Sequence, residues 1–375
     1  MSTRLNSPSF VSEVQTLVNG TVPSADNSTI DTGLVAWNKF KTILDESTTG
    51  NQVFNNVIVS TYSLIYTTTA AYAGGVLALN GDIHFIPNSA NRGQKISSTG
   101  IVSTYSLVYT TSQAYQGAVL ASNGDIHFVP LSANRGQKIN ASGVVSTYSL
   151  VYTTSIAYIG GILAPNGDIH FIPRQADRGQ KVSSSGVVST YSLVYTLTDG
   201  YDGGVLAPNG DIHFVPLSAA VGQKISSAGV VSTYSLVYTA LTAYQGGVLA
   251  ANGEIHFVPL SANRGQKIST SGVVSTYSLA YTVAVGYNGG VLAPNGDVHF
   301  IPWATTTVGQ KVSSSGIVST YSLLYTVTNG YSGGVLTSTG DIHIPPYSAN
   351  RGLKFSTLSG FDFKNIALSP FFNKF

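Results

Sequence analysis

The sequence predicts an all-β protein: a seven-bladed β-propeller with four strands in each blade, closed by a strand from the N-terminal side of the chain. Three observations predict this fold. A segment similar to Gly-Val-Val-Ser-Thr-Tyr-Ser-Leu-Val-Tyr-Thr recurs along the chain, turns divide each repeat into four short stretches, and the first and last repeats are incomplete in complementary ways. Four strands in about 40–45 residues is the size of a propeller blade.

The glycines that precede the recurring segment follow one another at an almost constant spacing. The first five are 43 residues apart, and the sixth follows after 44 because the loop after Pro302 has one additional residue; they are Gly100, Gly143, Gly186, Gly229, Gly272 and Gly316. A seventh copy, which lacks the glycine, begins near Val57. Seven copies of blade length predict seven blades.

The unit that begins at Gly203 illustrates the four strands. A short stretch of small residues, 203–207, precedes a Pro-Asn-Gly turn at 208–210, which is a strong hairpin signal. The second strand follows at 211–215, the third near 223–226, and the fourth at 230–238, where the side chains alternate between two faces. The two glycines at the start of the first strand predict that this strand lies at the crowded central axis.

The two ends of the repeat array are complementary. The chain enters it with a fourth strand, 57–67, and leaves it after a third strand, 353–357. Pairing these two strands would complete the seventh blade and remove two exposed strand edges. The alternative is a domain-swapped oligomer, in which the first strand completes the ring of another subunit.

Two terminal segments differ in character from the propeller, which we expect at residues 55–358. Residues 1–54 contain apolar residues at helical spacing in 9–18 and 32–44, which predicts a partly helical arm that anchors or caps the propeller. The segment 359–375 is rich in phenylalanine, so we expect it to pack under the propeller or against a neighbouring subunit.

One motif carries a resemblance to a known family. The stretch Gly-Gly-Val-Leu-Ala-Pro-Asn-Gly, followed by a short apolar strand that ends in proline, stands at 203–216 and 289–302, with variants in the other units. It resembles a β-propeller repeat family seen in bacterial and viral proteins, and the resemblance covers about residues 55–357. The chain departs from that family in having Asp-Ile-His where Lys-Ile-Tyr is more frequent. The resemblance implies the propeller fold.

The composition limits the kinds of partner that we expect for the protein. Charged residues make up 9% of the chain, and the 18 basic and 16 acidic residues are dispersed, so we expect no nucleic-acid partner. No apolar stretch approaches the ~20 residues of a membrane helix, so we expect no membrane insertion. Residues 1–17 do not resemble a signal peptide, and the chain has no cysteine.

All seven histidines occupy one repeat position, two residues after an acid: His84, His127, His170, His213, His256, His299 and His343. On a strand this spacing places both side chains on one face. Catalysis requires one asymmetric group of residues, and histidines in seven separate blades cannot converge on one metal. We therefore expect a hydrogen-bonded acid–histidine pair that braces each blade, or a weak ligand site repeated in each blade. We expect no catalytic residues, metal or cofactor.

The repeats differ mainly in two loops, one after the second strand and one after the fourth. Because strands alternate in direction, both loops emerge on the same face of the propeller. Binding residues are often placed on loops of a rigid scaffold, so we expect a partner on this face. The candidate binding residues are Arg174, Asp177, Arg178, Asp199, Asp202, Trp303 and Tyr347. The alternative is neutral drift at exposed positions after duplication.

These observations favour a non-enzymatic structural or attachment component of a phage or virus particle. Its partners would be other virion or assembly subunits, bound through residues 1–54 and 359–375, and it would be located in the virion. The alternative function is a lectin-like module that binds carbohydrate, including a host-surface glycan. Outside a particle, the protein would be a soluble extracellular or cytoplasmic protein. We do not expect an enzyme.

Overall fold

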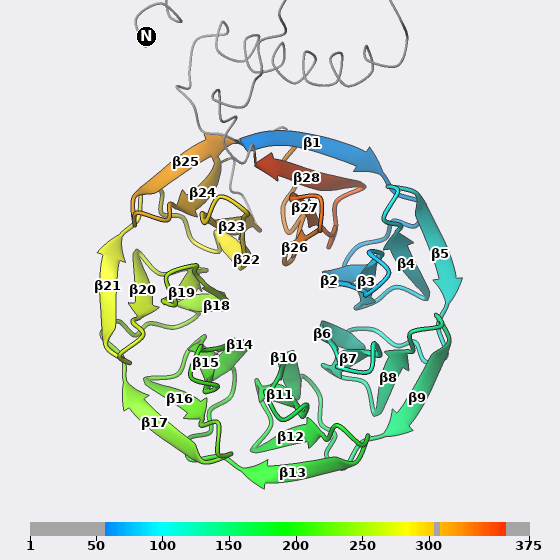
Figure 1. Cartoon of the computed structure of the whole chain (residues 1–375), viewed down its shortest axis with the longest axis horizontal. Helices are drawn as coiled ribbons and strands as arrows, with labels where there is room; N and C mark the ends of the chain where they lie inside the picture. The colour runs from blue at the N-terminus through cyan, green and yellow to red at the C-terminus, as the bar shows by residue number, and fades with distance from the viewer. Residues whose placement is uncertain (1–56, 304–307, 324, 358–375) are drawn as a thin grey trace, which may run out of the picture. The chain divides into compact units, whose positions relative to one another are not determined.

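A computed structural model describes residues 57–303, 308–323 and 325–357, and all structural statements below concern these residues. They form seven antiparallel sheets of four strands each, arranged as blades around a central axis (Figure 1). This confirms the predicted all-β, seven-bladed propeller. The described residues contain no helix, and none that could cross a membrane. The helices predicted at 9–18 and 32–44 lie outside the described residues.

We number the blades in chain order, and in each blade the strands run from the axis outward. Blade 1 contains β2 (Tyr72–Leu77), β3 (Ile83–Pro87), β4 (Arg92–Ile96) and β5 (Val102–Ser106). Blade 2 contains β6 (Tyr115–Leu120), β7 (Ile126–Pro130), β8 (Arg135–Ile139) and β9 (Val145–Ser149). Blade 3 contains β10 (Tyr158–Leu163), β11 (Ile169–Pro173), β12 (Arg178–Val182) and β13 (Val188–Ser192).

The next three blades repeat this order. Blade 4 contains β14 (Tyr201–Leu206), β15 (Ile212–Pro216), β16 (Val221–Ile225) and β17 (Val231–Ser235). Blade 5 contains β18 (Tyr244–Leu249), β19 (Ile255–Pro259), β20 (Arg264–Ile268) and β21 (Val274–Ser278). Blade 6 contains β22 (Tyr287–Leu292), β23 (Val298–Pro302), β24 (Val308–Val312) and β25 (Val318–Ser322).

Blade 7 closes the ring with strands from both sides of the array. It contains β26 (Val335–Leu336), β27 (Asp341–Ile344) and β28 (Arg351–Thr357), and its outer strand is β1 (Val57–Ser63). β1 pairs antiparallel with β28, from Val57 opposite Thr357 to Ser63 opposite Arg351. The predicted closure is therefore confirmed, and it occurs within one chain.

The two faces of the ring carry different connections, as blade 3 illustrates. The turns at 164–168 and 183–187 lie on one face, which we call the turn face. The loops at 174–177 and 193–200 lie on the opposite face, which we call the loop face. The predicted placement of both variable loops on one face follows from this alternation of strand direction.

A ring of glycines surrounds the axis, one from each blade. Gly160 and Gly203 have φ of 72° and 81°, in the left-handed region that favours glycine. A Cβ atom on Gly160 would lie 3.1 Å from the Cα atom of Gly203, and one on Gly117 would lie 2.6 Å from that of Gly160. The inner strands therefore approach each other at backbone distance, as the sequence predicted.

Buried glutamines connect neighbouring blades, and they also explain why the outer strands end earlier than predicted. Gln266 of blade 5 is fully buried, and its Oε1 accepts hydrogen bonds from the backbone N–H groups of Val237 and Tyr238, at 3.0 and 2.8 Å. Those two residues were expected in the outer strand of blade 4, but β17 ends at Ser235. We call this contact a glutamine bridge; six interfaces have one, formed by Gln94, Gln137, Gln180, Gln223, Gln266 and Gln310.

A second set of contacts joins the blades on the loop face. The residue after the proline of each second strand accepts a backbone hydrogen bond from the next blade, at 2.7 Å from Ala157 to Leu131 and at 2.9 Å from Ala71 to Tyr347 across the closure. All seven junctions have this bond. Four of the seven acceptor residues have buried side chains: Asn88, Leu131, Leu217 and Leu260. Variation at those four positions therefore changes packing rather than an exposed surface.

Candidate functional site

The histidine of each blade contacts a tyrosine from the outer strand. In blade 3, Nδ1 of His170 lies 3.3 Å from the hydroxyl oxygen of Tyr191, within hydrogen-bonding distance. The ring of Tyr191 lies across Gly179, where any side chain would collide with it. Burial, together with the charge of Lys181, lowers the pKa of His170 to about 4, so the ring is neutral near pH 7.

The acid of each blade contacts a lysine rather than the histidine. Lys181 Nζ lies 2.7 Å from Asp168 Oδ2, and the hydrogen bond and charge of Lys181 lower the pKa of Asp168 against the opposing effect of burial. Lysine–acid pairs occur in all seven blades: Lys95–Asp82, Lys138–Asp125, Lys181–Asp168, Lys224–Asp211, Lys267–Glu254, Lys311–Asp297 and Lys354–Asp341.

The predicted hydrogen bond between the acid and the histidine is therefore wrong, although both side chains lie on one strand face. The antiparallel register places His170 opposite Lys181, and the lysine reaches the acid while the histidine turns to the tyrosine. The nearest approach of an acid to a histidine is in blade 5, where Glu254 Oε2 lies 3.8 Å from His256 Nε2. The lysine–acid pair recurs in all seven blades and the tyrosine–histidine contact in blades 1–6, and we call these repeated contacts the braces of the blades.

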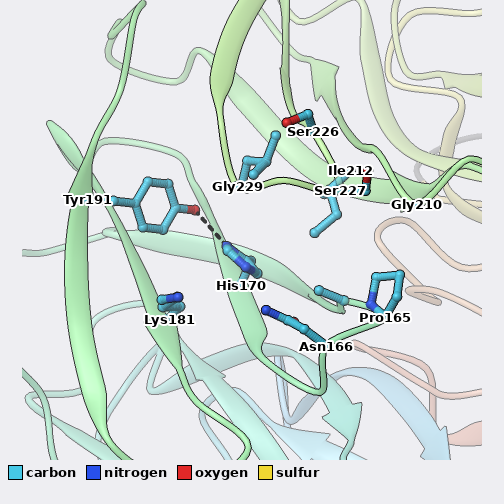
Figure 2. Close-up of a pocket in the computed structure, with 12 residues that line it drawn as sticks. Pro165, Asn166, His170, Lys181, Tyr191, Gly210, Ile212, Ser226, Ser227 and Gly229 are labelled. Atoms are coloured by element: carbon cyan, nitrogen blue, oxygen red, sulfur yellow. Dashed lines mark hydrogen bonds between the residues drawn. The ribbon is translucent and has the colours of Figure 1, made fainter.

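A small cavity of about 100 Å³ lies beside one of these histidines, between blades 3 and 4 at the turn face (Figure 2). Blade 3 contributes Asn166, His170 and Lys181 to its lining, and blade 4 contributes Ser226 and Ser227. Figure 2 shows the hydrogen bond between Tyr191 and His170. The described residues contain no cluster of three or more side chains suited to holding a metal ion.

The loop face carries a charged cluster where blades 3 and 4 meet, and this cluster does not recur between the other described blades. Arg174 Nε lies 2.7 Å from Asp199 Oδ1, and Arg174 Nη1 lies 3.6 Å from Asp202 Oδ2. The second distance allows attraction between charges but is too long for a hydrogen bond. Gln175 Nε2 also reaches Asp199 Oδ1, at 3.4 Å.

Asp202 is the unusual member of this cluster. Its side chain is only 6% exposed, and its Oδ2 atom has no hydrogen-bond partner among the described residues. Burial raises its pKa to about 7, against the opposing effect of Arg174. It lies in a β-bulge between Tyr201 and Gly204, next to the axial glycine Gly203. The equivalent bulge occurs in the inner strand of each of blades 1–6, so the bulge belongs to the repeat and the acid at this position does not.

The other candidate binding residues lie apart from this cluster and form two pairs. Arg178 Nε lies 2.9 Å from the exposed Asp177, and its guanidinium stands 4.9 Å from the ring centre of Tyr152. Trp303 and Tyr347 are both half-buried, and their ring centres are 4.8 Å apart where blades 6 and 7 meet. The structure thus brings together Arg174, Asp199 and Asp202.

Sequence reasoning named Asp202 but missed the equivalent position in the other blades. This position follows a buried tyrosine in each blade and varies between blades: Ala73, Gln116, Ile159, Asp202, Gln245, Asn288 and Ser332. Gln245, Asn288 and Ser332 are buried and polar. Variation in a strand that is otherwise almost invariant was the signal that could have identified them.

Comparisons with known proteins bear on the family and the fold. The sequence model of the virginiamycin B lyase family matches residues 57–344. A solved streptogramin B lyase has a TM-score of 0.72 and 20% identity, over 82% of this chain and 99% of that chain. A catalytically inactive histidine-to-alanine variant of virginiamycin B lyase from Staphylococcus aureus, with quinupristin, has a TM-score of 0.71 and 19% identity, over 80% and 99%.

A third solved structure shows how widely the architecture is shared. The WD40 β-propeller domain of Doa1 has a TM-score of 0.61 and 12% identity, over 80% of this chain and 98% of that one. At such identities the solved structures establish the fold, whereas the family model establishes the family. No curated protein sequence matches the chain.

These matches overturn the function expected from the sequence. The expectation that the chain is not an enzyme is wrong, because the family that it matches is one of lyases. The expected roles as a component of a phage or virus particle and as a lectin are contradicted by the same finding. The reasoning failed because it treated a repeated scaffold as grounds against catalysis. The family model covers 288 consecutive residues from Val57 onward, which is more than half of the chain. The chain therefore belongs to the virginiamycin B lyase family.

Proposed function

We propose that the chain is a lyase whose reaction site is the cluster of Arg174, Asp199 and Asp202 on the loop face. A lyase reaction breaks a bond by removing a proton and releasing a leaving group, without adding water. It needs a base that is partly ionised at the working pH and a group that stabilises developing negative charge. The observation that carries this proposal is the buried carboxyl group of Asp202.

Asp202 has the properties of a general base. With a pKa of about 7, its carboxyl group is about half ionised near neutral pH, and it is a stronger base than an ordinary aspartate. Its Oδ2 atom has no hydrogen-bond partner among the described residues, so it is able to accept a proton. It is held by a bulge of β14 beside the axis, on a rigid strand rather than a loop.

Arg174 supplies the complementary charge. Its Nε is held by Asp199, which leaves Nη1 directed toward Asp202 at 3.6 Å. When Asp202 takes a proton, the attraction between these two groups ends, and the guanidinium becomes available to the negative charge that develops on the substrate. Asp199 orients Arg174 and is a positioning residue.

Histidine is the competing candidate for the base, because the inactive relative carries a histidine-to-alanine change. In this chain the histidines belong to the repeated braces, and the described cavity lies beside His170. The low pKa of about 4 makes His170 a weak base, and its Nδ1 already contacts Tyr191. We therefore favour Asp202 and use His170 to distinguish the two locations.

The relatives indicate which substrate to test first. They are described as acting on virginiamycin B or streptogramin B, and one was solved with quinupristin. We propose a compound of this group as the substrate. Incubation with quinupristin should give products whose combined mass equals that of the substrate, whereas hydrolysis would add the mass of one water. Product masses that include a water would contradict a lyase reaction.

Substitution separates the two locations. Asp202→Asn removes the base but keeps the shape of the side chain, so we expect turnover to fall about 100-fold or more without loss of thermal stability. Asp177→Asn changes an exposed acid of the same face and should leave turnover unchanged. If His170→Ala abolishes turnover while Asp202→Asn does not, the site lies at the turn face and the proposal is wrong.

A further inference from the structure

The charges of the propeller are divided unequally between its two faces. The seven described lysines all pair with acids in the repeated braces, at 2.6–3.0 Å. The six described arginines all lie on the loop face, where they begin third strands or, for Arg174, follow a second strand. The charge of the braces is therefore neutralised internally, and the remaining positive charge lies on the loop face.

Four of these arginines have no ion pair among the described residues, whereas Arg174 and Arg178 contact acids. The four are the exposed first residues of β4, β8, β20 and β28, and we call them the arginine crown: Arg92, Arg135, Arg264 and Arg351. Three of them stand in blades 7, 1 and 2, which are neighbours in the closed ring, and the fourth stands in blade 5. Asp177 and Asp199 are the exposed acids of this face, and both are paired with arginine.

Exposed aliphatic side chains accompany the arginine crown. Leu241 is 80% exposed at the end of a loop between blades 4 and 5, and Leu197 and Val285 are 41% and 39% exposed in the corresponding loops. Five further aliphatic residues, each 61–62% exposed, follow the loop-face ends of outer strands: Ile65, Val108, Val151, Val194 and Val237. The turn face carries seven aliphatic residues of comparable exposure, Leu79, Ile101, Val144, Val187, Val230, Val273 and Ile317, but none of the described arginines. The combination of unpaired cations with exposed aliphatic side chains is therefore particular to the loop face.

We infer that the loop face docks on the surface of a membrane that contains anionic lipids. Guanidinium groups attract the negatively charged headgroups, and the aliphatic side chains between them can enter the boundary with the acyl chains. A soluble polyanion would bind the arginines but would make no favourable apolar contact with Leu241. The inference concerns binding at the periphery of the face and does not depend on the proposed lyase reaction.

Vesicle binding tests the inference on the full chain. Co-sedimentation should show binding to vesicles of phosphatidylcholine with phosphatidylserine, little binding to phosphatidylcholine alone, and loss of binding at high salt. Replacing the four residues of the arginine crown by glutamine should weaken binding on the order of 100-fold. Equal binding to both kinds of vesicle, or unchanged binding after this replacement, would overturn the inference.

The chain offers a matched pair of leucines for the aliphatic contribution. Leu241→Asp should weaken vesicle binding about tenfold, because it places a charge at the membrane boundary. Leu79→Asp changes a residue that is 75% exposed on the turn face, and it should leave binding unchanged. If both variants bind equally and DNA competes with the vesicles, the ligand is a soluble polyanion and the inference is wrong. Asp202→Asn should bind vesicles normally, which separates this test from that of the lyase site.

Discussion

The six continuous blades and the closing blade use different contacts to pack against the blade that precedes them. Each of blades 1–6 has a fully buried glutamine that accepts two backbone hydrogen bonds from the preceding blade, as Gln180 does in blade 3. Blade 7 has Leu353 at this position, and Phe355 packs against Tyr321 of blade 6, with ring centres 5.6 Å apart. Gln94 bridges blade 7 to blade 1 in the usual way, so the interface between blades 6 and 7 is the one that lacks a glutamine bridge in the described part of the chain. The difference teaches that apolar packing can replace a polar bridge at one interface of the ring.

The same contrast holds inside the blades. In blades 1–6 the tyrosine hydroxyl contacts histidine Nδ1 at 3.1–3.3 Å. In blade 7 the rings of Tyr62 and His343 remain 5.4 Å apart, but neither the hydroxyl nor Nδ1 has a hydrogen-bond partner in the described part of the chain. The inner strand β26 is also reduced to two residues. Blade 7 should therefore be the least stable blade.

Acidification should give the largest effect on the free energy of unfolding, and it should reveal the lower stability of blade 7. Burial lowers the pKa of all seven histidines from 6.5 to about 4. As the pH falls below 6.5 the unfolded chain gains protons that the folded chain does not, so the free energy of unfolding decreases until about pH 4. Each histidine contributes up to about 3 kcal/mol to this loss.

Denaturant unfolding at pH 7.5, 6 and 5 would measure this decrease, and hydrogen exchange would locate it. We expect the amides of β27 and β28 to lose protection at a higher pH than those of β11 and β12. A free energy of unfolding that is constant between pH 7 and 5 would contradict the neutral state of the buried histidines. Simultaneous loss of protection in both blades would contradict the weakness of blade 7.

Replacing a bridging glutamine by leucine, the residue that blade 7 has at this position, should give the next largest effect on the free energy of unfolding. Gln180→Leu leaves the backbone N–H groups of Val151 and Tyr152 without their acceptor, so we expect a loss of about 2–4 kcal/mol in the free energy of unfolding. Gln266→Leu removes the equivalent bridge between blades 4 and 5 and should cost the same. A cost well below 1 kcal/mol at both positions would mean that the bridges do not stabilise the ring.

A pair of tyrosine substitutions should give the smallest effect but the sharpest contrast. Tyr105→Phe removes the contact to His84 and should cost about 1 kcal/mol. Tyr62→Phe removes a buried hydroxyl without a described partner, so it should be neutral or stabilising by up to about 1 kcal/mol. Thermal and denaturant unfolding of both variants would measure the difference. Equal destabilisation would show that Tyr62 has a hydrogen-bond partner in solution.

Much of the fold follows from the sequence because the repeat imposes it. A period of 43 residues, hairpin turns at fixed offsets and incomplete end units predict the blade number, the strand order and the closure. Strand ends were less predictable, because they depend on contacts between blades. Val237 and Tyr238 continue the alternating pattern, yet Gln266 of the next blade takes their N–H groups.

The candidate site was only partly predictable for the same reason. The variable loops identified Arg174, Asp199 and Asp202, but 28 residues separate the first from the last, and only the register between blades brings them together. The burial that raises the pKa of Asp202 is a property of the folded ring, which no local pattern indicates. The partner of each histidine was missed because a periodic pattern gives the face of a side chain and not its rotamer.

The axial glycines have a consequence for how such a protein can evolve. Tandem repeats of nearly identical sequence invite unequal recombination, which adds or removes whole units. Here the gap between Gly117 and Gly160 does not admit even one extra methyl group. An eighth unit would widen the circle and separate these backbones, while a sixfold circle would force them into collision. The axial glycines therefore favour a ring of seven blades, although recombination can produce chains with other numbers of repeats.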